Sequence, residues 1–562
     1  MGTLSRKSHK YGFFLFAFII VILFSLPLLK LFSFSEKFFF QFDHTRHVFH
    51  YLASDTQFYH ALFNTFVITT SVTFLSGLLG VILALFVGLL DTHRIHMWSF
   101  IVFLILFLPP TFLAIAWIDV GTLMNFLFHI QNPMYTQKAT ILLLSIHLFP
   151  IAFFVVIDQI KRIPFSFVEA AKSNGASPKT LLLKILWPLL RPSIIKGCML
   201  IWFSCLGHFT FFALLGIPGQ FSTLTTLMYT KLIGFGVKRM DEIVLLCMIL
   251  IVLGGVGILI LKYLGGKTYP LPVTSKKLQH ATFESRLTRI FVYALLSVLC
   301  LSIFLPMIKL ILTSFTSRKT ISSSWLQFSW ENYHYIFTNP SFYRALFNSF
   351  ILAISTGVIL FFQSSIFEFG ARLTGYSFFR RIRFGLQILY LMPGSILAIG
   401  MILFLLKPFD WMKFLKLHLL YNTLFMILMA YMIRFFAFHL NIVHAGSDNF
   451  SLRLFEAAKS CGAPLFQIWR KIFLPLMIPN LLNGSFLVFI LIMHEVTIAS
   501  LLPSSNTQTI GVILLSLMEH GDTKAAAALC MVITFILVLC RFLMHHWTKH
   551  VLNRAYSIDS SL

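Results

Sequence analysis

The sequence predicts an all-α integral membrane protein of about twelve transmembrane helices, arranged as two tandem repeats of six. Of its 562 residues, 58% are hydrophobic and only 11% are charged, whereas soluble domains carry roughly 25% charged residues. The apolar residues form runs long enough to cross a bilayer as helices. In addition, one polar sequence occurs twice, each time between apolar runs. These three observations indicate a membrane protein that contains an internal duplication.

The duplicated polar sequence begins with Glu-Ala-Ala-Lys-Ser in both copies and continues to a glycine and an alanine. An unchanged spacing relates three pairs of residues across the copies: Glu169 and Glu456, Gly175 and Gly462, and Pro188 and Pro475. Glu-Ala-Ala-Lys favours a helix, and a glycine in the left-handed conformation commonly ends one. In the first copy Ser177 and Pro178 can begin the next helix, and in the second copy Pro464 does so. Each copy therefore predicts a helix, a sharp bend and a second helix.

This pattern resembles the cytoplasmic EAA loop of the permeases of binding-protein-dependent ABC importers. The family pattern is Glu-Ala-Ala, three residues, Gly, nine residues and Ile-x-Leu-Pro. The second copy fits completely, through Ile472, Leu474 and Pro475, whereas the first has Trp187 in place of the usual leucine. The resemblance implies that both loops dock on cytoplasmic ATPase subunits. The residues implied in this coupling are Glu169, Ala170, Ala171, Gly175, Pro188, Glu456, Ala457, Ala458, Gly462 and Pro475.

The apolar runs divide the chain into two units with the same plan. The first unit, residues 1–264, has predicted spans at about 11–29, 61–90, 98–128, 139–160, 193–215 and 243–262, with its EAA loop at about 161–192. A Pro-, Lys- and Ser-containing stretch at 265–289 predicts a cytoplasmic linker. The second unit, residues 290–562, has predicted spans at about 290–314, 345–371, 384–406, 418–444, 483–502 and 525–546, with its EAA loop at about 445–482. A further match, of Phe58–Phe66 with Phe342–Phe350, supports the repeat.

The net charge of +25 fits a membrane topology better than nucleic-acid binding. With twelve spans and an internal N-terminus, both EAA loops, the linker and the C-terminus lie inside and collect most of the Lys and Arg, as the positive-inside rule requires. No basic face or nucleic-acid motif gathers these charges. Residues 33–60, 216–242 and 315–344 are predicted to be external, and the resemblance implies that a binding protein docks there.

Two ionisable residues occupy equivalent predicted spans. His208 and Glu495 keep the spacing of the EAA loops, and charge at membrane depth is costly unless it lines a cavity or pairs with a polar group. We expect both to face a translocation pathway. Polar side chains that lock one helix to another are an equally good interpretation. Weaker candidates are Asp119, Asp158, Glu368 and Arg434.

Motifs for catalysis, metals or cofactors are not indicated. Gly265-Gly266-Lys267-Thr268 resembles the end of a P-loop, but Leu261 stands where its first glycine belongs. The seven cysteines and twenty histidines show no ligand or disulfide spacing. We therefore expect a transport subunit without its own ATPase site, without a cofactor and without a metal centre.

Segments around His208 also resemble permeases of the ferric-iron type. They are Leu206–Phe209, Ala213–Pro218, Leu224–Thr226 and Pro393–Gly400. His208 stands where that group usually has an acidic residue, and Phe212 stands at a common proline. The resemblance implies a fused, two-unit permease in the bacterial inner membrane, with two ATPase subunits inside and a periplasmic or lipid-anchored binding protein outside.

Ferric iron is the favoured solute, and thiamine, phosphonate, polyamine, sulfate and molybdate stay open. An ion-driven secondary transporter would require broken spans with central acidic residues, which the sequence does not display. A membrane-embedded enzyme would require a cluster of catalytic groups, and none is visible.

Overall fold

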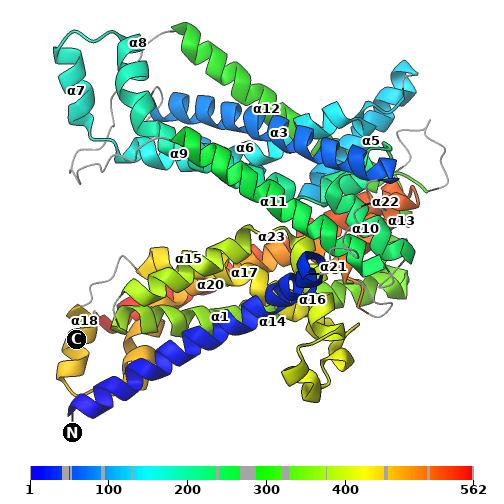
Figure 1. The fold of residues 1–562 in the computed structure, drawn as a ribbon. Coiled ribbons are helices and arrows are strands. Elements are labelled where there is room, and N and C mark those ends of the chain that lie inside the picture. The colour runs from blue at the N-terminus through cyan, green and yellow to red at the C-terminus, as the bar shows by residue number, and fades with distance from the viewer. Residues whose placement is uncertain are drawn as a thin grey trace. The chain divides into compact units, whose positions relative to one another are not determined.

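The structure is a computed structural model that describes most of the chain (Figure 1). The described residues are 2–40, 50, 54–89, 95–129, 131–235, 239–265, 286–318, 328–374, 376–447, 453–502 and 507–559. Within them the fold is helical, and an isolated β-bridge joins Thr316 to Phe328. Most of the predicted linker, residues 266–285, lies outside the described part.

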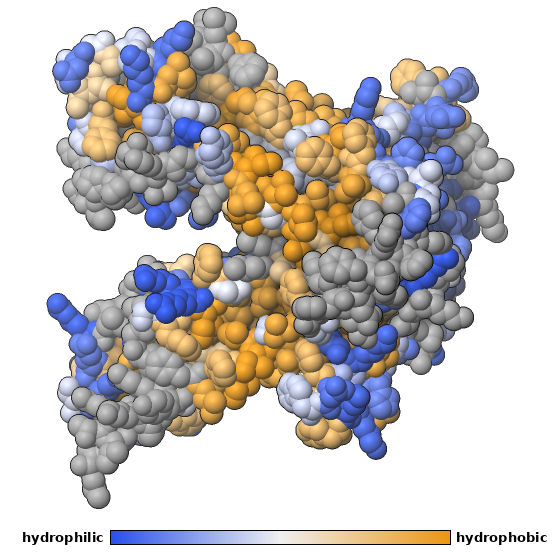
Figure 2. Space-filling view, viewed as in Figure 1, coloured by the Kyte–Doolittle hydropathy of each residue, from blue (hydrophilic) through white to orange (hydrophobic). Residues whose placement is uncertain are grey.

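Eleven of the described helices are long and apolar enough to cross a membrane. The candidate spans are Leu15–Phe34, Thr56–Gly88, Pro110–Phe128, Gln137–Arg162, Leu181–Leu206, Met240–Leu261, Tyr293–Ser314, Pro340–Leu373, Leu424–Ser447, Leu465–Met493 and Thr523–Met544. The remaining predicted span, 384–406, is divided at Pro393 into α15 (Tyr376–Leu391) and α16 (Gly394–Leu406). In Figure 2, hydrophobic residues cover the long helices of each unit and hydrophilic residues gather near the helix ends. The chain is therefore a multi-pass membrane protein.

Contacts divide the chain into two compact units. Unit 1 comprises Met1–Thr45, Tyr333–His520 and Ala528–Leu562, and unit 2 comprises Arg46–Asn332 and Gly521–Ala527. Each unit is built on three mutually packed helices. In unit 2 they are α3 (Thr56–Leu89), α6 (Gln137–Arg162) and α9 (Trp187–Leu206), and in unit 1 they are α14 (Pro340–Thr374), α17 (Leu424–Ser447) and α20 (Leu474–Met493).

The first helix of each sequence repeat packs in the unit formed mainly by the other repeat. Helix α1 (Gly2–Phe40) contacts α14, α15 and α16 in unit 1, where the backbone carbonyl of Pro27 lies so close to Gly400 that an added Cβ would be 2.8 Å from it. Helix α12 (Arg286–Ser314) packs on α5 (Pro110–Phe128) in unit 2. There the Thr313 hydroxyl donates to Asp119, and the Lys309 ammonium lies 3.5 Å from the same carboxylate. The compact units therefore differ from the sequence repeats by an exchange of first helices.

Small residues allow the three central helices of unit 2 to approach closely. A Cβ added to Gly80 of α3 would lie 2.6 Å from the carbonyl oxygen of Phe149 on α6, and one added to Gly197 of α9 would lie 3.1 Å from the Cα of Ala152. Helices in membranes commonly associate through such residues, because close backbone approach increases van der Waals contact.

The same crossing in unit 1 is polar. Ser364 of α14 lies 2.7 Å from His439 Nδ1, and Ser485 of α20 lies 3.1 Å from His439 Nε2. The His439 ring is fully buried and replaces the methyl group of Ala152 at the same register. In unit 1 one imidazole therefore bridges α14 and α20, whereas in unit 2 small residues bring the equivalent helices together. Interhelical hydrogen bonds and close packing of small residues are both common ways in which membrane helices associate.

Several predicted boundaries were wrong. Helix α1 continues to Phe40, beyond the predicted end of its span at about residue 29. Within the expected external segment 216–242, Leu224–Phe235 forms α10, which has a buried face. The predicted span 98–128 is divided between α4 (Ile95–Phe107) and α5. The break between α4 and α5 lies at Pro109 and Pro110, because proline has no backbone donor to continue the helix.

Candidate functional site

The first duplicated loop folds as a rigid bend, which we call the first elbow (Phe165–Leu186). Helix α7 (Phe165–Ser173) ends at Gly175, whose φ is +73°, and α8 (Pro178–Thr180) follows. The Ala176 amide donates to the Ala171 carbonyl at 3.0 Å, the bond that defines a Schellman C-cap. The Ser177 hydroxyl accepts from the Thr180 amide at 3.2 Å and begins the next helix. The predicted helix, turn and helix are confirmed in this loop.

The second elbow (Arg453–Phe473) repeats this geometry. Helix α18 (Arg453–Ser460) ends at Gly462, whose φ is +77°, and α19 (Leu465–Ile468) follows Pro464. The Ala463 amide donates to the Ala458 carbonyl at 3.1 Å, the same C-cap bond. Residues 448–452 of the predicted loop lie outside the described part of the chain. The register found in the sequence thus corresponds to an identical backbone conformation.

One face of each elbow packs against the apolar cluster of its unit, and the other face is exposed. In the first elbow Ala171 is buried in the apolar cluster of unit 2, and Ala176 packs against that cluster. In the second elbow Ala458 and Ala463 pack against the cluster around Phe455 and Phe473 in unit 1. The exposed residues of the motif include Glu169, Ala170, Gly175, Glu456, Ala457 and Gly462. Each elbow therefore leaves a glutamate, an alanine and the glycine of the bend exposed.

Each elbow continues into its spanning helix through a π-helical turn, which the sequence analysis did not anticipate. The turns are Leu181–Leu186 and Trp469–Phe473, and they end directly before Trp187-Pro188 and Leu474-Pro475. The amide of Trp187 bonds to the Leu182 carbonyl, and the amide of Leu474 bonds to the Trp469 carbonyl. Proline has no amide donor and crowds the carbonyl four residues earlier, so a wider turn accommodates it. The two prolines of the motif thus lie where elbow and span join.

The two predicted pathway residues lie at breaks in their spans. His208 follows the end of α9 at Leu206, and Glu495 follows the end of α20 at Met493. These helices were expected to run on to about residues 215 and 502. The backbone carbonyl of His208 accepts from the Thr225 hydroxyl at 3.4 Å, and the carbonyl of Glu495 lies against Gly511, 2.8 Å from where its Cβ would be. Both repeats therefore fold the chain back onto the break.

The Glu495 carboxylate caps the short helix α21 (Thr497–Leu501). It accepts from the Ile498 amide at 2.9 Å and from the Ala499 amide at 3.3 Å. The side chain is 9% exposed, and Arg434 of α17 interacts with it electrostatically. In unit 2 the residue at the register of Arg434 is His147, whose ring centroid lies 6.0 Å from that of His208. Residues at the same register of the preceding span, Arg434 and His147, thus interact with Glu495 and His208.

The other ionisable candidates have local partners. Glu368 of α14 is 1% exposed and lies 2.9 Å from His444 Nδ1, while the Ser447 hydroxyl donates to it at 2.6 Å. Asp158 forms an exposed ion pair with Arg162 at 2.8 Å, and Asp119 binds α12 as described above. Among the described residues, no group of three or more His, Cys, Asp or Glu side chains could hold a metal ion. The contacts of Glu368 and Asp119 join neighbouring helices within one unit, whereas the Asp158–Arg162 pair lies within α6.

Two segments of this chain, residues 76–266 and 369–554, match the protein family described as the binding-protein-dependent transport system inner membrane component. Together they cover more than half of the chain. The chain belongs to this family. It is therefore an ABC importer permease of the inner membrane, and the family domain occurs in it twice.

Individual relatives of this permease are distant. The spermidine/putrescine transport system permease protein PotC of Haemophilus influenzae is 24% identical over 257 residues, which are 44% of this chain and 93% of PotC. The Fe(3+)-transport system permease protein FbpB 2 of the same organism is 25% identical over 401 residues, which are 69% of this chain and 72% of FbpB 2. A crystal structure of a bacterial alginate ABC transporter, in complex with an alginate pentasaccharide-bound periplasmic protein, is 16% identical over 47% of this chain and 94% of its own, with a TM-score of 0.39.

The repeated segment Phe58–Phe66, which matches Phe342–Phe350, also has a structural role in this permease. Asn64 and Asn348 donate to the backbone carbonyls of Ser222 and Gln508, each at 3.0 Å. The next residues, Thr65 and Ser349, accept from the first amides of α10 and α22 (Ile510–Glu519), each at 2.9 Å. These side chains cap short buried helices whose amides would otherwise lack partners, a role that the repeated sequence alone does not reveal.

Cys461 allows the side of the membrane to be tested. It is exposed next to Gly462, whereas the other six cysteines are buried or half-buried. We expect a membrane-impermeant maleimide to label the protein in inside-out vesicles but not in intact cells, because the second elbow should face the cytoplasm.

The matched controls are Cys461→Ser, which should abolish labelling, and Phe414→Cys in that background. Phe414 is 76% exposed in the segment between α16 and α17, which should face outside. Labelling of Cys461 from outside intact cells would contradict the topology.

Proposed function

We propose that this chain forms the translocation pathway of an ATP-driven importer, and that its two elbows receive the force from separate cytoplasmic ATPase subunits. The main support for this proposal is that both elbows have a closed C-cap, one face packed on their unit and one face exposed. A helix whose C-cap is closed by a Schellman bond and whose inner face packs on the spans can transmit a displacement to them, whereas a flexible loop would absorb it.

Substrate delivery and energy supply require partners in this proposal. The family name itself includes a binding protein, and we propose that such a protein docks on the external segments of this chain. The alginate transporter structure contains a periplasmic protein of that kind. The ATPase-coupling residues are Glu169, Ala170, Ala171, Gly175 and Pro188 in the first elbow and Glu456, Ala457, Ala458, Gly462 and Pro475 in the second.

Ferric iron is the solute that we favour. The alignment with FbpB 2 covers 69% of this chain and therefore extends over both repeats, whereas the alignment with PotC covers 44%. The PotC relatives make a polyamine the second candidate. Thiamine, phosphonate, sulfate and molybdate are the remaining alternatives within this class of importer.

The solute is tested by uptake into proteoliposomes that contain the full chain, its ATPase subunits and its binding protein. We expect ATP-dependent uptake of ferric iron and not of spermidine, thiamine, phosphonate, sulfate or molybdate. Uptake of spermidine alone would replace the iron assignment with the polyamine one and leave the importer proposal intact. Uptake without any ATPase subunit would contradict the importer proposal itself.

Gly175→Val and Gly462→Val together should uncouple ATP hydrolysis from uptake. A residue with a Cβ in the left-handed conformation costs roughly 1–2 kcal/mol, and a β-branched residue is strained further, so each elbow should lose its bend. ATP-dependent uptake should fall while the amount of protein in the membrane stays normal.

Gly521→Val is the matched control for this double variant. Gly521 has a φ of +74° and open space around it, as the two elbow glycines have, but it lies outside the elbows. The Gly521→Val variant should keep normal ATP-dependent uptake. Normal uptake by the double variant, or equal loss in the control, would contradict a coupling role of the elbows.

His208 and Glu495 are proposed to line or gate the pathway at the two span breaks. Glu495→Gln keeps an oxygen that can cap α21 but replaces the carboxyl group, with which Arg434 interacts electrostatically, by an uncharged amide. We expect it to lower uptake while thermal stability changes little. Unchanged uptake would remove Glu495 from the pathway, and an equal loss of stability would assign it to helix packing instead.

A further inference from the structure

Arg434 lies near the middle of the spanning helix α17 in unit 1, and its guanidinium has few protein partners. The side chain is half-buried. Within the described part of the chain it makes one hydrogen bond, from Nη1 to the Met392 carbonyl, and at 3.4 Å this bond is long. A guanidinium has five N–H donors, and an unpaired charge at membrane depth is costly. The position therefore favours an anionic partner.

The guanidinium lies at the first turn of α16. A Cβ added to Gly394, the first residue of that helix, would be 2.9 Å from Arg434 Nη1 and 3.2 Å from the guanidinium carbon. Pro393 precedes the helix and provides no side-chain cap. The first amides of a helix lack intrahelical acceptors and carry partial positive charge. Two positive groups therefore meet at one point, which is favourable when an anion joins them.

The Glu495 carboxylate does not fill this role. It interacts electrostatically with Arg434, but among the described residues no carboxylate lies within ion-pair distance of the Arg434 guanidinium. The Glu495 oxygens accept from the amides of Ile498 and Ala499 instead. The N-terminus of α21 thus has an anionic cap, whereas the N-terminus of α16, which packs against α21, has none from the protein's described residues.

Two buried hydroxyl groups accompany the guanidinium. Ser395 and Tyr431 are each 0% exposed, and within the described part of the chain neither hydroxyl has a well-aligned hydrogen-bond partner. Ser395 follows Gly394 in the first turn of α16. Tyr431 lies three residues before Arg434, on the same face of α17, and its hydroxyl interacts electrostatically with Arg434 and Glu495. Because buried polar groups are normally hydrogen-bonded, these hydroxyls are further donors for an anion at the guanidinium.

Unit 2 has different side chains at the equivalent positions. The registers of Gly394, Ser395, Tyr431 and Arg434 are occupied there by Pro110, Thr111, Leu144 and His147. A proline at the start of α5 supplies no amide donor, and an imidazole replaces the guanidinium. The combination of an uncapped helix start and an arginine is therefore found in unit 1 and not at the same place in unit 2.

We propose that the first turn of α16 and the Arg434 guanidinium bind an oxyanion group of the transported solute, with Ser395 and Tyr431 as further donors. The proposal rests on the importer function proposed above and specifies the charge of its solute. A guanidinium matches the paired oxygens of a carboxylate, sulfate or phosphonate group.

The same guanidinium repels a polyamine and a bare Fe³⁺ ion. Ferric iron would therefore pass this site as a complex with an oxyanion ligand. Sulfate, molybdate or a phosphonate would bind directly. The chemistry at the site is the same in both cases, and the two sources of the oxyanion are distinguished by experiment.

The test is equilibrium dialysis of the full chain, purified in detergent, against radiolabelled ligands. The probes are sulfate, molybdate and methylphosphonate, each alone, and citrate with and without ferric iron. We expect saturable binding of at least one probe. Binding of an anion alone would identify a free oxyanion, whereas binding of citrate only together with iron would identify an anionic iron complex. Absence of binding by every probe at millimolar concentration would overturn the proposal.

Two variants locate the site. Arg434→Gln removes the guanidinium, and the methyl group of Gly394→Ala displaces it from the α16 turn. Each should weaken binding about tenfold, because a hydrogen bond to a charged group is lost. Arg381→Gln, the same substitution at an exposed position of α15, should leave the affinity unchanged.

Arg434→Lys and Gly394→Ala keep the test decisive if Arg434→Gln does not fold. The lysine variant retains the charge and should recover part of the affinity, and the end of a flexible side chain can yield to the added methyl group. Equal affinity in the wild type and in both Gly394→Ala and Arg434→Lys would overturn the proposal. Preferential binding of spermidine would also overturn it.

The assay separates this proposal from the importer function. It contains neither ATPase subunits nor a binding protein, so a failure to bind anions leaves ATP-driven uptake untouched. Conversely, anion binding that Arg434→Gln weakens would stand even if the reconstituted chain did not couple ATP hydrolysis to uptake.

Discussion

The rigid connection between each elbow and its spanning helix depends on the backbone hydrogen bond that closes the left-handed glycine turn. The Ala176 amide bonds to the Ala171 carbonyl, and the Ala463 amide bonds to the Ala458 carbonyl. Only a residue without a Cβ adopts the required φ at little cost. With the turn closed, one helix face packs on the unit and the other stays exposed. The π-helical turns at Pro188 and Pro475 then direct each elbow into its span.

The two units reach the same helix arrangement with different chemistry. Where α3, α6 and α9 cross, Gly80 and Ala152 permit backbone contact, whereas in unit 1 the His439 imidazole joins two serines across the same crossing. A lipid environment gives helices no hydrophobic reason to associate, so either close packing or interhelical hydrogen bonds must hold them. In a duplicated chain, one repeat can replace close packing of small residues by interhelical hydrogen bonds while both repeats keep the same helix arrangement.

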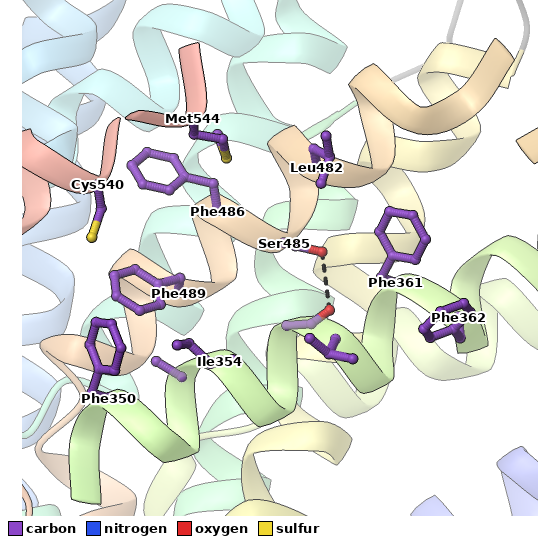
Figure 3. Close-up of a pocket in the computed structure, with 13 residues that line it drawn as sticks. Phe350, Ile354, Phe361, Phe362, Leu482, Ser485, Phe486, Phe489, Cys540 and Met544 are labelled. Carbon is purple, nitrogen blue, oxygen red and sulfur yellow. Dashed lines mark hydrogen bonds between the residues drawn. The ribbon is translucent and has the colours of Figure 1, made fainter. Parts of the chain in front are cut away.

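The same divergence separates the two span breaks and the two last helices. One break carries two histidine rings, and the other carries a buried carboxylate that caps a helix and faces Arg434. Helix α11 (Met240–Gly265) packs on α9 through Gly254 and Gly257, whereas Cys540 and Met544 of α23 (Thr523–Asp559) line an apolar groove with α14 and α20 (Figure 3). The repeats are therefore equivalent in backbone and different in side chains, which gives one chain two distinct halves of a transporter.

The sequence by itself determined the membrane class, the duplication and the elbows, because hydrophobic run length, repeat register and glycine turn chemistry are local properties. It also located Glu495 and His208, but as residues within continuous spans. Only the tertiary structure decided that both lie at helix breaks, since a carboxylate that caps α21 is a contact made after the chain has turned. The exchange of α1 and α12 between the units was equally invisible, because any apolar helix is compatible with several neighbours. Shape complementarity, as between Gly400 and Pro27, selects one of them, and it exists only in the folded chain.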